Sequence, residues 1–149
     1  MRESVAIVVV LYKAEMSVYH ERLLEDEMVT LVVVDNTPDR DLALKKDRLI
    51  YVPLQRNMGI ATAQNEGIRQ AECLGCDYII FFDQDSKIPE RYSEGIIEEY
   101  KRIEQLIPNL FLLGPTIING RTEEEYKSTI HKDIWICLLY TSPSPRDTR

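Results

Sequence analysis

Two runs of β-branched residues near the N-terminus constrain the fold more than any other feature of this chain. Residues 5–11 read Val-Ala-Ile-Val-Val-Val-Leu, and residues 29–34 read Val-Thr-Leu-Val-Val-Val. A strand with one solvated face alternates between apolar and polar side chains, so these continuous runs predict strands that are buried on both faces. Such strands are typical of a parallel sheet with helices on both sides.

Segments with helical periodicity alternate with these runs and with three further apolar runs. We expect additional strands at residues 49–54, 78–82 and 110–118, and helices at about residues 17–26, 60–74 and 89–106. This β-α-β-β-α-β-α-β order predicts an α/β fold with a mainly parallel, Rossmann-like sheet. Gly67 lies inside the second helix, where glycine is unfavourable, and therefore predicts close packing against a neighbouring element.

Composition excludes several classes of protein. The net charge is -7 over 149 residues, and the basic residues are scattered, so we expect no nucleic-acid-binding surface. No apolar run reaches the roughly 18 residues of a membrane span, and the N-terminus lacks the pattern of a signal peptide, which favours a cytoplasmic location. We expect the cysteines, Cys73, Cys76 and Cys137, to be reduced and structural.

Two carboxylates follow the very apolar run at residues 78–82. Asp83 and Asp85 are spaced i, i+2 at the carboxyl end of an expected buried strand. Their oxygens suit a hard divalent cation, Mn²⁺ or Mg²⁺, which keeps open positions for phosphate oxygens. An acidic turn without a metal is the alternative interpretation of this short motif.

Other polar residues also follow expected strands. Asp35 ends the second strand, where it can accept a hydrogen bond from a ribose hydroxyl or a base imide, or form a turn. Asn57 is a candidate cap, Gly59 allows a backbone to pass close to a ligand, and Asn65 lies within the following helix. No Gly-x-Gly-x-x-Gly or Walker A sequence is present, which argues against a dinucleotide site.

Four motifs in register resemble a known enzyme family. They are Tyr12 at the end of the first strand, Asp35-Asn36, the series Asn57-x-Gly59-x-Ala61-x-Ala63-x-Asn65-x-Gly67, and Asp83-Gln84-Asp85-Ser86. Their order and spacing resemble inverting family 2 glycosyltransferases with the GT-A fold. The Asp-Gln-Asp-Ser form and Gly59-Ile60-Ala61 resemble the rhamnosyltransferase branch, and the resemblance extends over residues 4 to about 135.

The resemblance implies a role for each motif. It places Tyr12 against a nucleobase that Asp35 hydrogen-bonds, and it places Asn57, Gly59 and Asn65 along the donor. Asp83 would contact the ribose or the metal, and Asp85 would ligate the cation that bridges the diphosphate. The implied donor is a nucleotide sugar, dTDP-L-rhamnose, and the implied acceptor is a saccharide or a lipid-linked sugar. This chain departs from the family pattern at Lys13-Ala14, where Asn and often Pro are usual.

The same resemblance predicts what this chain lacks. The general base of the family is an Asp or Glu well downstream of the Asp-x-Asp segment, and we find no match, so we name no catalytic residue. Residues 123–125, Glu-Glu-Glu, are expected to form a solvated loop. We expect residues 1–136 to be the N-terminal, nucleotide-sugar-binding part of a GT-A domain that is inactive alone. Residues 137–149, rich in Ser, Pro and Arg, are expected to be a disordered, non-native tail.

Two other functions share part of this pattern. An Asp-x-Asp after an apolar strand is also the nucleophile motif of haloacid-dehalogenase-type phosphatases, although there it follows the first strand of the core. A non-enzymatic, receiver-like binding module would also place acidic residues at strand ends. Nucleotide-selective binding that depends on manganese separates the three hypotheses.

Overall fold

The computed structural model describes residues 3–115, 129–131 and 134–136. The chain divides into two compact units, one extending to Ser93 and the other beginning at Glu94. The boundary falls inside the third helix. The predicted division at residue 136 stays a prediction, because residues 137–149 lie outside the described part of the chain.

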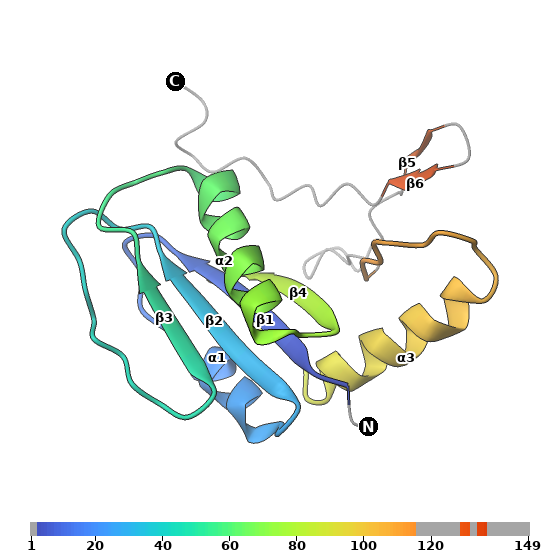
Figure 1. Cartoon of the computed structure of the whole chain (residues 1–149), viewed down its shortest axis with the longest axis horizontal. Coiled ribbons are helices and arrows are strands. Elements are labelled where there is room, and N and C mark those ends of the chain that lie inside the picture. The colour runs from blue at the N-terminus through green and yellow to red at the C-terminus, as the bar shows by residue number, and fades with distance from the viewer. Residues whose placement is uncertain (1–2, 116–128, 132–133, 137–149) are drawn as a thin grey trace, which may run out of the picture. The chain divides into compact units, whose positions relative to one another are not determined.

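A four-stranded parallel sheet forms the first unit. Its strands are β1 (Val5–Leu11), β2 (Val29–Asp35), β3 (Leu49–Pro53) and β4 (Tyr78–Asp83). The order across the sheet is β3-β2-β1-β4, so the first strand lies between the second and the fourth (Figure 1). The predicted α/β class and the positions of all four predicted strands are confirmed. The expected burial of β4 was wrong, because β4 ends the order of the described sheet and its residues are half-buried or exposed.

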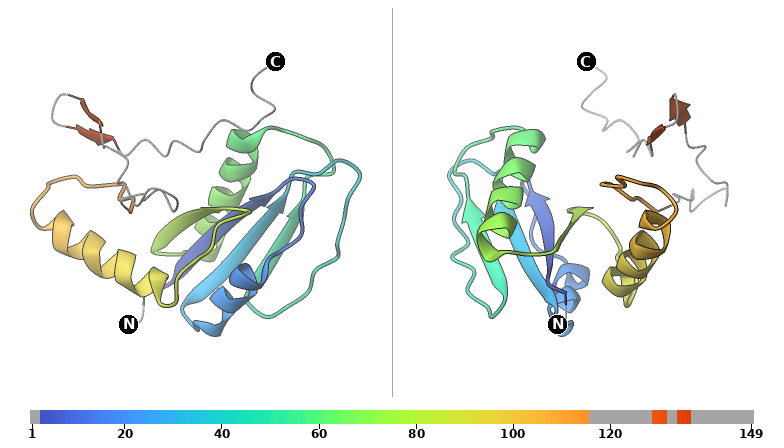
Figure 2. Two further views of the ribbon diagram at one scale, coloured as in Figure 1. Left: turned by 180° about the vertical axis from the view of Figure 1, so that it is seen from behind. Right: turned by 45° about the vertical axis from the view of Figure 1, so that its right-hand side comes forward.

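Helices cover both faces of this sheet, which explains the uninterrupted apolar runs. Every residue of β1 is buried, and β2 is buried at every position except Thr30. Helix α2 (Ile60–Leu74) covers one face, while the short helix α1 (Val18–Arg22) and the 3₁₀ turn η1 (Leu23–Glu25) lie on the other (Figures 1 and 2). The core beneath α2 consists of Ala6, Val8, Val10, Val32, Val34, Ala63 and Ala71.

Helix α1 begins with a reciprocal cap. The hydroxyl of Ser17 accepts a hydrogen bond from the amide of His20 (3.4 Å), and Nδ1 of His20 accepts one from the amide of Ser17 (3.2 Å). Leu23 and Leu24 are buried, but Val18 is 61% exposed. The α-helix lasts five residues and then tightens to 3₁₀ geometry, so Val18 and the two leucines do not lie on one face.

Helix α2 packs unusually close to β1. A Cβ atom on Gly67 would lie 2.3 Å from Cγ1 of Val8, a distance that real Cβ atoms do not adopt. The predicted close packing at Gly67 is therefore confirmed. Gly75 ends the helix in the left-handed conformation, with φ of 68°.

The second unit contains most of α3 (Tyr92–Glu104) and a hairpin formed by β5 (Thr129–His131) and β6 (Ile134–Ile136). Helix α3 begins three residues later than predicted, after Arg91, whose φ is 55°. The helix also ends two residues earlier than predicted, and Leu106 beyond its end is 70% exposed.

The predicted strand at residues 110–118 was wrong for its described part, because residues 110–115 form no strand. Phe111 and Leu112 are 88% and 71% exposed, and Pro115 has no N–H with which to join a ladder. Residues 116–118, like the predicted loop at residues 123–125, lie outside the described part. No helix in the described part is both long and apolar enough to cross a membrane.

We predict that Gly67→Ala lowers the free energy of unfolding by about 1–3 kcal/mol, because the added methyl group overpacks the contact with Val8. Gly95→Ala is the matched control, since Gly95 lies inside α3 and a Cβ atom there has nothing within 4 Å. That change should stabilise the protein by about 0.5–1 kcal/mol, because alanine favours the helix. Urea unfolding of both variants measures the two effects, and equal stabilities would contradict the close packing.

Candidate functional site

The register of the sheet brings the carboxyl ends of all four strands to one edge. Leu11 pairs with Asp35, Asp35 with Pro53, and Val10 with Asp83. The residues that follow these strands therefore lie next to one another, although up to 72 positions separate them in sequence. This edge is where open α/β sheets bind ligands.

Asp35 is fully buried at this edge, and its carboxylate is completely hydrogen-bonded. Oδ1 accepts from the amide of Thr37 (3.0 Å) and from Nη2 of Arg40 (2.8 Å). Oδ2 accepts from Nε of Arg40 (2.6 Å) and from the hydroxyl of Tyr51 (2.7 Å). A carboxylate offers about four acceptor positions, and these four donors fill them. A direct hydrogen bond from a base to Asp35, as the resemblance implies, would therefore need one of them to leave.

The charges of this cluster support one another. Burial alone raises the pKa of Asp35, but hydrogen bonds from Arg40, Tyr51 and Thr37 outweigh it and leave the pKa below its usual value. The hydrogen bond to Asp35 raises the pKa of Arg40 further above its ordinary range. Burial, together with the bond to Asp35, raises the pKa of Tyr51 to about 12. The cluster is therefore an ion pair with a neutral tyrosine at neutral pH.

A second set of hydrogen bonds fixes the segment that leads into α2. The amide group of Asn36 donates to Oδ1 of Asn57 (3.0 Å), and its oxygen accepts from the backbone of Met58 (2.7 Å). Oδ1 of Asn57 also accepts from the amide of Gly59 (3.0 Å). Gly59 has a φ of 80° and gives α2 no side-chain cap. The N-terminus of α2 is thus held beside the end of β2.

The loop after β1 is tied to both neighbouring strands. The amide of Tyr12 donates to Oε1 of Gln84 (2.8 Å), and the amide of Lys13 donates to the hydroxyl of Thr37 (2.8 Å). The ammonium group of Lys13 lies 5.3 Å from the centre of the Tyr12 ring. Tyr12 therefore lies directly beside the Asp-x-Asp segment, held there by its middle residue.

Asp83 and Asp85 interact electrostatically. Partial burial of the Asp83 carboxyl, and then the negative charge of Asp85, raise the pKa of Asp83 above its usual value. A divalent cation between the two carboxylates would remove this repulsion, so the pair suits a hard cation. Within the described residues, no group of three or more acidic, histidine or cysteine side chains is placed to hold a metal. A cation here would complete its coordination with ligand oxygens or water.

Asn65 is the one predicted site residue that the structure leaves apart from this edge. It is exposed in the second turn of α2, about 8 Å along the helix axis from Ile60. The hydrogen bonds described above do not include it. Its assignment to the ribose-diphosphate region stays a prediction.

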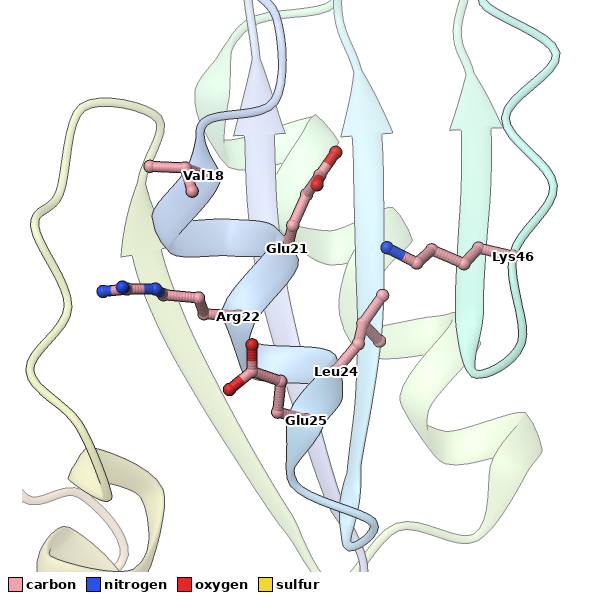
Figure 3. A pocket seen from close by; sticks show the side chains of 6 residues that line it. All are labelled: Val18, Glu21, Arg22, Leu24, Glu25 and Lys46. Carbon is pink, nitrogen blue, oxygen red and sulfur yellow. The ribbon is translucent and has the colours of Figure 1, made fainter.

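A shallow hollow of about 310 Å³ lies elsewhere, on the α1 face of the sheet (Figure 3). It is lined by Val18, Glu21, Arg22, Leu24, Glu25 and Lys46. These side chains carry charges of both signs, and none belongs to the four motifs. The strand ends, not this hollow, gather the predicted site residues.

The family of this chain follows from comparison with known proteins. Residues 11–133 match the profile of the family described as Glycosyl transferase family 2. The chain belongs to glycosyl transferase family 2. Its fold is accordingly the predicted GT-A type of α/β fold, and the phosphatase and receiver-like alternatives are excluded. No solved structure matches the chain significantly.

One curated relative supports the predicted branch of family 2. Over 97 residues the chain is 35% identical to the dTDP-rhamnosyl transferase RfbF of Shigella flexneri. The match covers 62% of this chain and 33% of that protein, so the matched segment spans about a third of the relative's length. Within family 2, the sequence of this chain therefore resembles a rhamnosyltransferase.

Sequence reasoning missed two members of this site, Arg40 and Tyr51. The alternation of side chains along strands could have placed Tyr51 on the same face as Asp35, since Val33 and Asp35 pair with Tyr51 and Pro53. Arg40 gave no such signal, because it lies in a long segment without periodicity. Its role follows only from the folded path of residues 36–48.

We predict that Asp85→Asn lowers the pKa of Asp83, because it removes a negative charge while burial remains. When folding raises the pKa of a carboxyl, the free energy of unfolding falls as pH rises through that pKa. Because the variant reduces this effect at Asp83, it should be at least as stable as wild type at pH 7. Carboxyl NMR titration without divalent cations measures the shift. Asp47→Asn is the control, because that side chain is 96% exposed beyond the opposite end of the sheet. An unchanged Asp83 pKa in Asp85→Asn would contradict the interaction.

Proposed function

We propose that this chain is the nucleotide-sugar-binding part of an inverting glycosyltransferase whose donor is dTDP-L-rhamnose. The observation that carries the proposal is the convergence of Tyr12, Asn57, Gly59 and the Asp83/Asp85 pair at the carboxyl edge of one parallel sheet. Family membership supports sugar transfer, and the similarity to a dTDP-rhamnosyl transferase supports the choice of donor.

Each element of the edge has a place in this proposal. The ring of Tyr12 lies against the nucleobase, an arrangement that its partly exposed position beside Gln84 allows. The uncapped first turn of α2 points its backbone N–H groups at the diphosphate, for which helix N-termini are suited. Asn57 and Asn36 hold that turn in place. These contacts bind and orient the donor before any bond breaks.

Asp83 and Asp85 would hold a Mn²⁺ or Mg²⁺ ion against the diphosphate. When bound, this cation acts as a Lewis acid that stabilises the negative charge on the departing nucleoside diphosphate. The protein's own contribution is a pair of carboxylates. Partial burial, and then the negative charge of Asp85, raise the pKa of Asp83, and a cation between the two carboxylates would favour their charged forms. We assign Asp85 as the metal ligand and Asp83 as a ligand of the ribose or the metal.

Our proposal for the acceptor depends only on membership of the family. We propose a saccharide or lipid-linked sugar as acceptor, in the assembly of a surface polysaccharide. An inverting transfer needs a general base to deprotonate the acceptor hydroxyl. We assign this base to no residue of the described part, and we expect the 149-residue chain to bind its donor weakly and to transfer little.

We predict manganese-dependent binding of dTDP to the full chain, measured by calorimetry with UDP and GDP for comparison. Affinity should follow the order dTDP, UDP, GDP, and Asp85→Ala should weaken dTDP binding at least tenfold, about 1.4 kcal/mol. Asp47→Ala is the matched control, because it removes an exposed carboxylate next to β3 and should leave binding unchanged. Binding that ignores both manganese and Asp85, or that favours GDP, would overturn the proposed donor site.

A further inference from the structure

His20 is a buried polar residue that the proposed donor site does not use. Its side chain is fully buried in α1, which covers the face of the sheet opposite α2 (Figure 3). Nδ1 accepts a hydrogen bond from the amide of Ser17 (3.2 Å), so the proton of the neutral ring is on Nε2. Among the described residues, Nε2 is the one buried side-chain nitrogen or oxygen without a hydrogen-bond partner of ordinary geometry. A buried N–H group without an acceptor is unfavourable and needs an explanation.

The backbone oxygen of Asp83 is the acceptor beside this ring. Burial lowers the pKa of His20, so the ring is neutral at neutral pH, and the backbone oxygen of Asp83 acts in the opposite direction. Because Nδ1 already faces the amide of Ser17, this oxygen lies on the Nε2 side of the ring. The buried N–H group therefore faces the last residue of β4.

The register of the sheet agrees with this placement. Gly67 of α2 contacts Val8, and Val8 pairs with Phe81, so these two strand residues point toward α2. Side chains alternate along a strand, and Phe82 therefore points to the opposite face, toward α1. A side chain from α1 can thus reach the backbone at the end of β4.

The backbone oxygen of Asp83 closes the turn that carries both carboxylates. It accepts a hydrogen bond from the amide of Ser86 (3.0 Å), and a carbonyl oxygen has a second lone pair for another donor. Within this turn, the side chain of Gln84 accepts from the amide of Tyr12 (2.8 Å). The loop after β1 thus fixes one side of the turn, and His20 lies where it can fix the other. The spacing of the two carboxylates depends on this turn.

We propose that His20 is a positioning residue for the Asp83/Asp85 pair, whose Nε2–H donates to the backbone oxygen of Asp83 and holds the turn in the shape that a divalent cation needs. A small movement of the ring or the turn completes this hydrogen bond and removes the penalty of a buried, unpaired N–H group. The effect on cation binding rests on the proposed function, whereas the contact with the Asp83 oxygen does not. The competing explanation is that His20 only caps α1 through Nδ1.

NMR of the imidazole ring in the wild-type full chain, without divalent cations or nucleotide, tests the contact. We expect a proton on Nε2 and none on Nδ1 at neutral pH. We also expect a nuclear Overhauser effect between the Nε2 proton and the amide proton of Ser86, because both groups face the same oxygen. A proton on Nδ1, or no Overhauser effect between these two protons, would overturn the proposal, whatever the protein binds.

Two substitutions of His20 separate positioning from capping. His20→Asn places an oxygen where Nδ1 lies and keeps an acceptor for Ser17, but no group of asparagine reaches the position of Nε2. His20→Gln can place an N–H donor there, and glutamine is also a normal capping-box residue at this position of a helix. Ser17→Ala is the matched control, because it removes the hydroxyl that caps α1 but leaves the imidazole ring. Urea unfolding verifies that all three variants fold.

Mn²⁺ binding in the presence of dTDP, measured from the electron paramagnetic resonance of the free cation, tests the effect on the pair. His20→Asn should weaken Mn²⁺ binding about tenfold, the lower end of the range for groups that orient a metal ligand. His20→Gln should restore most of the affinity. Ser17→Ala should bind Mn²⁺ like wild type, although it lowers the midpoint of urea unfolding.

Equal Mn²⁺ affinities of wild type and folded His20→Asn would overturn the positioning role. An equal loss of affinity in Ser17→Ala would also overturn it, because the effect would then come from the cap of α1. Failure of wild type to bind Mn²⁺ would instead remove the proposed metal site, and the NMR result would then decide whether His20 holds the turn.

Discussion

The parallel pairing of β1 with both β2 and β4 is the constraint on which the rest of this structure depends. Because β1 lies between two strands that run in its own direction, three carboxyl ends meet at one edge, and β3 adds a fourth. Its residues are buried on both faces, so α1 and α2 must cover opposite sides. The close contact of Gly67 with Val8 then brings α2 against the sheet and helps to place its N-terminus beside the strand ends.

Polar groups at this edge hydrogen-bond one another, so the loops around the strand ends are held together before any ligand binds. The Asp35–Arg40–Tyr51 cluster and the Asn36–Asn57 pair belong to different faces of the same strand end, yet both fix loops that border the proposed donor. The Asp83/Asp85 pair differs, because burial and the charge of Asp85 raise the pKa of Asp83, and a cation would offset the repulsion between the two carboxylates. In the proposed site, the backbone amides at the N-terminus of α2 would contact the diphosphate, and the Asp83/Asp85 pair would hold its cation.

Much of this could be predicted from the sequence, because strand burial and helix periodicity leave direct patterns in it. The four strands, the bounds of α2 and the close packing at Gly67 followed from such patterns. The sequence could not show that Arg40 folds back onto Asp35, because contacts made by an irregular segment leave no periodic trace. The absence of a strand at residues 110–115 was missed because an apolar run alone does not reveal whether a neighbouring strand can pair with it.

In the proposed donor site, a cation and a nucleotide bind together at the carboxyl edge of the sheet. Paramagnetic broadening of backbone amide signals by Mn²⁺, in the full chain saturated with dTDP, tests this proposal. We predict that the amides of Tyr12, Gln84 and Asp85 broaden, while those of Val29 and Leu49 at the amino ends of β2 and β3 stay sharp. Broadening centred instead on Glu21 and Glu25, around the hollow beside α1, would contradict it.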